Sequence, residues 1–99
     1  MTSLQKNASK YHLPMTSTPE EIETNLDFRG RTLNFGQYYI VTGYTWGGAM
    51  NKPSFFGAVY KADKDRFNCD DEVNLVATSD ELFWDTGRAA FWAMSNCEG

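Results

Sequence analysis

Residues 78–96, TSDELFWDTGRAAFWAMSN, combine a helix-start signal with a run of small residues at helical spacing. Thr78 followed three positions later by Glu81 matches a capping box, which predicts that the helix begins there. The side expected to face the core carries small or aliphatic residues, which let a helix approach a sheet closely. These residues are Leu82, Thr86, Ala89, Ala90 and Ala93. The sequence therefore predicts a C-terminal helix packed on one face of a β-sheet.

The strands of that sheet are expected just upstream of this helix. Residues 31–46, 54–63 and 72–77 are rich in aromatic and β-branched residues and are separated by short polar or glycine-rich loops. Gly36-Gln37 either turns a hairpin, giving four strands, or precedes one strand over 37–46, giving three. Short connections favour an antiparallel meander.

A short helix is expected before the strands, at about residues 19–27. Thr18, Pro19 and Glu21 form a helix start, and Ile22 and Leu26 are four residues apart. Residues 1–16 are polar without apolar periodicity, so we expect a flexible N-terminal arm, pinned through its Tyr and Leu at positions 11 and 13. The prediction is a single α+β domain over 17–99, in the order helix, three or four strands, helix, with both helices on one face.

The opposite face of the sheet is then expected to show aromatic rings to solvent. Tyr38, Tyr44 and Trp46 alternate along the first long strand and share one side. Tyrosine and tryptophan tolerate a half-wet position because each has a polar tip. An exposed patch of this kind indicates a protein partner, a small ligand or a second copy of the chain.

Trp92 is a further candidate, because helical spacing places it with Asp85 and Arg88 on the polar side of the last helix. Arg88 precedes it by four residues, so the guanidinium is expected over the indole. Either Trp92 lies under the N-terminal arm, or it anchors a protein partner, as tryptophan and arginine often do. In the second case Trp92→Ala leaves folding intact and abolishes binding.

Acidic residues dominate the charge pattern. The net charge is −4, and residues 63–85 hold eight acids against two bases. This field repels phosphate backbones, so direct nucleic-acid binding is not expected, whereas a protein with a basic surface is a suitable partner. The acids expected to steer such an encounter are Asp63, Asp65, Asp70, Asp71 and Glu72.

Signals for an enzyme are weak, and no catalytic, metal or cofactor site is predicted. His12 is the single histidine, and Cys69 lies among acids that would raise the pKa of its thiol and weaken it as a nucleophile. The acidic segment from Asp63 lacks the central glycine and final glutamate of a calcium loop. The glycines of TGYTWGG, residues 42–48, are not followed by the Lys-Ser/Thr of a phosphate loop.

The order helix, three strands, helix resembles in topology that of the double-stranded RNA-binding domain. That family carries a lysine cluster at the start of its second helix. Here the corresponding position holds Ser79, Asp80 and Glu81. The resemblance therefore extends to the order of elements and not to an RNA-binding surface.

The sequence lacks an apolar segment behind Met1 and a membrane-spanning run, which predicts a cytoplasmic chain without a membrane partner. Its two cysteines are expected to be reduced, with a 69–97 disulfide as the alternative. We expect a non-enzymatic protein-binding module, for example a phage or mobile-element inhibitor that blocks a basic, nucleic-acid-handling host protein such as a CRISPR or nuclease complex. The alternatives are a small-ligand or carbohydrate binder with an aromatic sheet face, and a homodimeric structural subunit.

Overall fold

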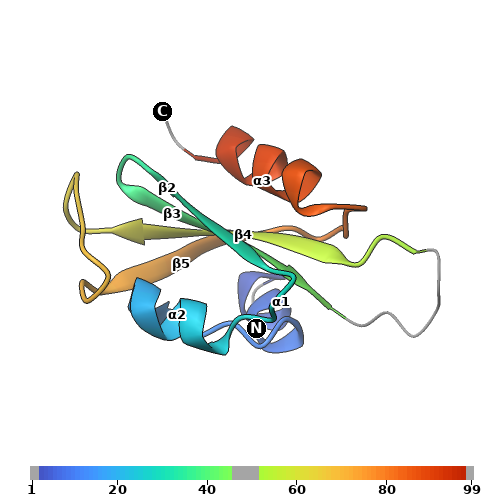
Figure 1. Cartoon of the computed structure of the whole chain (residues 1–99), viewed down its shortest axis with the longest axis horizontal. Coiled ribbons are helices and arrows are strands. Elements are labelled where there is room, and N and C mark those ends of the chain that lie inside the picture. Colours follow the sequence, from blue (N-terminus) through green and yellow to red (C-terminus); the bar gives the residue numbers. More distant parts are fainter. Residues whose placement is uncertain (1–2, 46–51, 98–99) are drawn as a thin grey trace.

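The computed structural model describes residues 3–45 and 52–97, which fold into an antiparallel sheet flanked by helices (Figure 1). This confirms the α+β class, with an N-terminal helix, a sheet and a C-terminal helix packed against it. In chain order the elements are α1 (Ser3–Lys10), β1 (Thr16–Ser17), α2 (Pro19–Asn25), β2 (Arg31–Phe35), β3 (Tyr38–Tyr44), β4 (Phe55–Ala62), β5 (Val73–Thr78) and α3 (Thr86–Ser95).

The sheet has five strands, one more than the upper prediction, in the order β1-β5-β4-β3-β2. Strands β2 to β5 form the expected meander, and Gly36 turns the β2–β3 hairpin at a φ of 62°, where glycine is favoured. The unexpected strand is β1, which pairs with the outer side of β5 through Thr16 opposite Asn74. Two residues are too few to show an alternating pattern.

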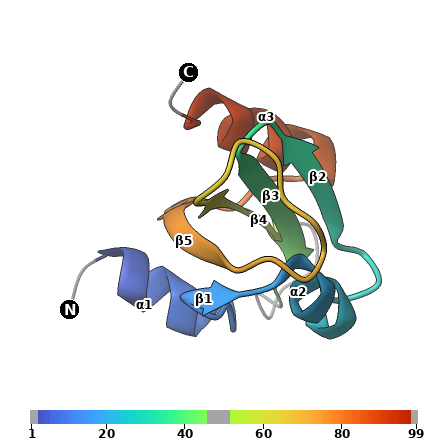
Figure 2. The same ribbon diagram turned by 90° about the vertical axis from the view of Figure 1, so that its left-hand side faces the viewer.

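Helices cover both faces of the sheet, so the prediction that they share one face is wrong. Helix α3 lies on one side and α1 and α2 on the other, as two perpendicular views show (Figures 1 and 2). Side-chain alternation divides the core accordingly. Ile40 and Val59 pack beneath α3, whereas Val41 and Ala58 pack toward α1 and α2. The sheet face expected to be open is therefore covered.

Small residues bring α3 close to the sheet, as the alanine pattern predicted. Ala89 and Ala93 are fully buried. A Cβ added at Gly57 of β4 would lie 2.8 Å from the Ala89 carbonyl oxygen and 2.9 Å from the ring of Trp92. The absence of a side chain at Gly57 thus sets how closely the helix packs.

Helix α3 begins seven residues later than its capping-box pattern suggested. Thr78 ends β5, and the main chain after it pairs with β4: the Ser79 N–H donates to the Gly57 carbonyl at 2.8 Å, and the Phe83 N–H to the Phe55 carbonyl at 2.7 Å. These bonds hold the segment extended. The N-cap is Asp85, whose carboxylate accepts from the Arg88 N–H at 2.7 Å.

The region expected as an arm contains a helix, α1, packed beside β5. Tyr11 holds it, as anticipated: its ring stacks on Phe56 with centroids 4.6 Å apart, and its hydroxyl donates to the Ser79 carbonyl at 2.8 Å. The start of α2 also follows its sequence signal. The Thr18 side chain accepts from the Glu21 N–H, and Pro19 occupies the first turn.

Candidate functional site

A shallow, mainly apolar groove of about 600 Å³ runs along α3 and the segment before it. Phe91 stands out from the middle of the helix with 70% of its surface exposed. Trp84, just before the helix, is 54% exposed. Scattered exposed apolar side chains are ordinary on a protein surface, whereas exposed aromatic rings that adjoin an apolar groove indicate contact with another molecule. The groove is lined by Phe83, Asp85, Gly87, Arg88, Phe91, Trp92 and Ser95.

The buried face of α3 determines which aromatic ring of the helix points outward. Burial of Ala89 and Ala93 fixes the inner side of the helix, and at 100° per residue Phe91 then points away from the sheet. The sequence analysis named Trp92 as the anchor for a protein partner and did not name Phe91 or Trp84. Phe91 is two residues from each of these alanines, about 160° around the helix from both, so its outward position already follows from the sequence. Trp84 lies outside the helix, because main-chain bonds to β4 hold the preceding segment extended.

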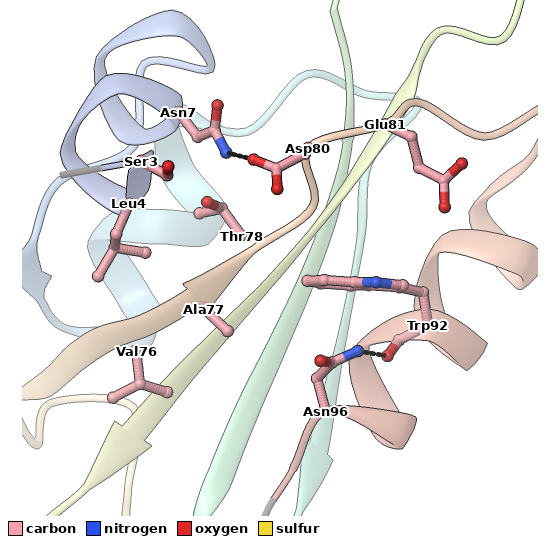
Figure 3. Close-up of a pocket in the computed structure, with 10 residues that line it drawn as sticks. All are labelled: Ser3, Leu4, Asn7, Val76, Ala77, Thr78, Asp80, Glu81, Trp92 and Asn96. Atoms are coloured by element: carbon pink, nitrogen blue, oxygen red, sulfur yellow. Dashed lines mark hydrogen bonds between the residues drawn. The ribbon is translucent and has the colours of Figure 1, made fainter.

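The sequence predicted that Trp92 lies on the outer polar side of the last helix, with the Arg88 guanidinium over its ring. Both predictions are wrong. The indole is half-buried, covers Gly57 and lies 6.4 Å from the ring of Phe83. In Figure 3 the indole extends from α3 toward Thr78. It lines a second hollow, of about 500 Å³, whose opposite wall is formed by residues of α1. Trp92 therefore contributes both to packing and to the groove wall.

Asp85 and Arg88 lie together at the mouth of the groove. The Arg88 Nε is 3.9 Å from the Asp85 Oδ2, and both side chains are more than half exposed. An exposed pair at this distance contributes little to stability. Both groups remain accessible for polar contacts around the apolar centre of the groove.

The tyrosines of β3 lie away from this groove and have other partners. The Arg29 guanidinium carbon lies 3.6 Å from the ring centroid of Tyr44, and Phe55 meets the same ring edge-on at 5.6 Å. Tyr38, at the other end of the strand, has Lys61 Nζ 5.9 Å from its centroid. Both tyrosines are half-buried, and Trp46 lies outside the described residues. They do not form a continuous exposed platform.

The acidic cluster occupies the loop between β4 and β5, at the end of the sheet opposite the entry to α3 (Figure 1). Asp71 organises this loop, because its carboxylate accepts from the Asn68 N–H at 2.8 Å and from Lys64 Nζ at 3.2 Å. Both interactions favour the charged form and lower the pKa of Asp71. Asp63, Asp65, Asp70 and Glu72 are exposed around it. The aromatic and acidic residues singled out in the sequence thus form separate surfaces.

A third hollow, of about 830 Å³, lies between α1 and α2 over the ends of β3 and β4. Its floor is apolar, with the stacked rings of Tyr11 and Phe56. Polar groups from His12, Asn25 and Tyr44 line its rim. A cleft with an apolar floor and a few polar rim groups is the usual form of a small-molecule site.

Metal ligands, cysteines and membrane-spanning helices are the remaining candidate features in the part of the chain that the structure describes. There, no three histidine, cysteine or acidic side chains gather closely enough to hold a metal ion. Cys69 is exposed and Cys97 half-buried, and both are free thiols. None of the described helices has the length and apolar character needed to cross a membrane.

Comparison with known families gives a match over residues 13–97, to nucleotide modification associated domain 4, Nmad4. The chain belongs to the Nmad4 family. The Nmad4 match runs from just after α1 through the whole sheet and α3, so it includes the groove. Searches of curated proteins and of solved structures found no match.

Proposed function

We propose that this Nmad4 chain is a non-enzymatic module that binds another protein through the groove on α3. The observation that carries the proposal is the exposure of Phe91 and Trp84 beside a groove with a half-buried tryptophan wall and an accessible arginine. Aromatic and arginine side chains around a desolvated centre are the usual anchors of protein interfaces.

The partner we expect has a basic surface. Asp80, Glu81 and Asp85 are exposed in the segment leading into the groove, against a single nearby base, Arg88. The acidic β4–β5 loop adds to the negative field, which would speed the approach of a basic protein. The family description, which names nucleotide modification, favours a partner that handles nucleotides or nucleic acid. A module covering the basic channel of such a protein would act as an inhibitor.

Retention on the immobilised protein from a lysate of the cells in which this chain occurs tests the proposal. The double change Trp84→Ser and Phe91→Ser removes two exposed rings and is expected to abolish retention of the partner without loss of the fold. Phe28→Ser is the matched control, because Phe28 is 83% exposed and does not line the groove. Retention should weaken steeply with salt. Equal retention by all three proteins, or salt-independent retention, would contradict the proposal.

A small-ligand function is the second candidate, favoured by the cleft between α1 and α2. Its size falls within the range of ligand pockets, and Tyr44, named from the sequence, forms part of its rim. Thermal shift with a panel of nucleosides and monosaccharides tests it, with Asn25→Ala as the variant expected to lose any shift. A panel without effect on the wild-type melting temperature would argue against this second function.

A further inference from the structure

Strand β2 is an outer strand that lacks the usual protection against pairing. Its sequence, RTLNF, contains neither proline nor lysine. Its one charged residue, Arg31, is held at the start of the strand by hydrogen bonds from Nη1 to the Phe28 and Gly30 carbonyls. Leu33 and Phe35 are 43% and 46% exposed. Outer strands of monomeric proteins are normally shielded by charged side chains, proline, bulges or a covering segment, because their free main-chain groups pair readily with another strand.

The hydrogen-bond pattern identifies which main-chain groups of β2 face outward. The Gln37 carbonyl accepts from the Ala62 N–H at 2.9 Å, so Gln37 and every second residue after it direct their main chain toward β4. The residues between them, including Tyr38 and Ile40, therefore bond toward β2. Their register partners there are Phe35 and Leu33. By alternation, the N–H and C=O groups of Thr32 and Asn34 point to the open edge.

We propose that two copies of this chain form a dimer through antiparallel pairing of their β2 strands. Thr32 of one copy would exchange both main-chain hydrogen bonds with Asn34 of the second copy, and Asn34 with Thr32. The two-fold axis then passes between the two Leu33 residues. Such an interface uses the same surface twice, as cyclic dimers do, and joins the sheets into one.

The side chains of β2 are complementary to themselves in this register. Leu33 lies opposite Ile40, on the face of the sheet that α3 covers, and would meet Leu33 of the second copy there. Arg31, on the same face, would stand opposite Phe35 of the second copy, where a guanidinium can lie over an aromatic ring. Cross-strand pairs of these kinds stabilise antiparallel sheets.

Assembly through β2 ends at two copies, because the strand at the other edge, β1, has only two residues and is too short to pair as β2 does. Strand β1 pairs with β5 at Val73 and Asn74, and the Leu75 N–H donates to the Met15 carbonyl at 2.8 Å. Helix α1 packs beside the same strand. With one edge strand long enough for this pairing, edge-to-edge association closes as a dimer and does not continue as a fibre.

Sedimentation velocity over a range of protein concentrations tests the dimer. The wild type is expected to shift from monomer to dimer as concentration rises. Asn34→Pro removes only the outward N–H, which an edge strand tolerates, and should abolish the dimer. Asn34→Ala keeps that N–H and should dimerise as the wild type does. Circular dichroism and thermal melting report whether each variant is folded.

A second variant keeps the test decisive if Asn34→Pro does not fold. Leu33→Glu places two carboxylates opposite each other at the two-fold axis and should likewise leave a folded monomer. A wild type that remains monomeric at every concentration overturns the proposal. So does a dimer that survives both β2 changes, or one abolished only by Trp84→Ser and Phe91→Ser, since that dimer would use α3.

Discussion

His12 occupies a main-chain conformation that glycine adopts more readily than any other residue. Its φ is 59°, and it ends α1 between two capping bonds, from the His12 N–H to the Ser9 carbonyl and from the Leu13 N–H to the Ala8 carbonyl. Helices commonly end in this way with glycine at the left-handed position. A side chain there costs free energy because its Cβ crowds the neighbouring carbonyl.

We therefore predict that His12→Gly raises the free energy of unfolding by about 1 kcal/mol. The relieved backbone strain stabilises the folded state by more than the extra entropy of glycine stabilises the unfolded chain. Urea denaturation measures the change. His12→Ala is the control, because it removes the imidazole but keeps the Cβ, and it should give no comparable gain. A His12→Gly protein no more stable than wild type would show that the imidazole makes a compensating contribution.

At the scale of elements, α3 depends on a cap that its sequence pattern did not identify. Asp85→Ala should lower the free energy of unfolding by about 1 kcal/mol, because the Arg88 N–H loses its acceptor and the helix start loses a negative charge. Glu81→Ala, which alters the capping box expected from the sequence, should change stability by less than about 0.5 kcal/mol. Thermal melting of both variants compares the two helix starts directly. A larger effect from Glu81→Ala would contradict the structural assignment.

The elements that could be predicted are those whose signals are local. The strands follow from β-forming side chains between turns, and α2 from Thr18 and Pro19. The start of α3 could not be read in this way, since Thr78 and Glu81 carry a valid local signal that main-chain pairing of Ser79 and Phe83 with β4 overrides. Helix α1 did leave a weak signal, because Leu4, Ala8 and Tyr11 are spaced by four and three and pack against the sheet.

The candidate site was predictable in composition and only partly in arrangement. That aromatic side chains near the C-terminus would remain accessible follows from their number in one short helix. Ala89 and Ala93 face the sheet, so Phe91, two residues from each, points outward, and the helical spacing could have identified it. Trp92 lies to one side of the helix, over Gly57. The separation of the acidic loop from the groove follows from the strand order, which residue spacing alone does not reveal.

At the scale of the whole molecule, the α1–α2 side of the sheet buries three phenol groups, each hydrogen-bonded to a distant segment. The Tyr11 hydroxyl donates to the Ser79 carbonyl at 2.8 Å, and the Tyr60 hydroxyl donates to the Pro14 carbonyl at 2.7 Å. The Tyr39 hydroxyl donates to Glu23 Oε1 at 3.1 Å. These bonds connect the N-terminal third of the chain to the sheet, and they require each phenol to keep its proton.

Burial disfavours the charged phenolate and raises the pKa of all three tyrosines, that of Tyr39 to about 12. In the unfolded chain these groups ionise near their ordinary value of 10.0. Between the two values the unfolded state releases protons that the native state retains, so stability falls as pH rises through this interval. Below it, the contribution of the three phenols is constant.

We predict that the urea midpoint is lower at about pH 11 than at about pH 9, and that tyrosinate absorbance from these three residues appears only as the fold is lost. Tyr39→Phe removes one of the shifted groups, so the fall in stability across the same interval should be shallower. Parallel measurements of tyrosinate absorbance and circular dichroism separate ionisation from unfolding. The prediction fails if all five tyrosines ionise reversibly near pH 10.0 while the sheet remains intact, because the phenols beneath α1 and α2 would then be open to solvent.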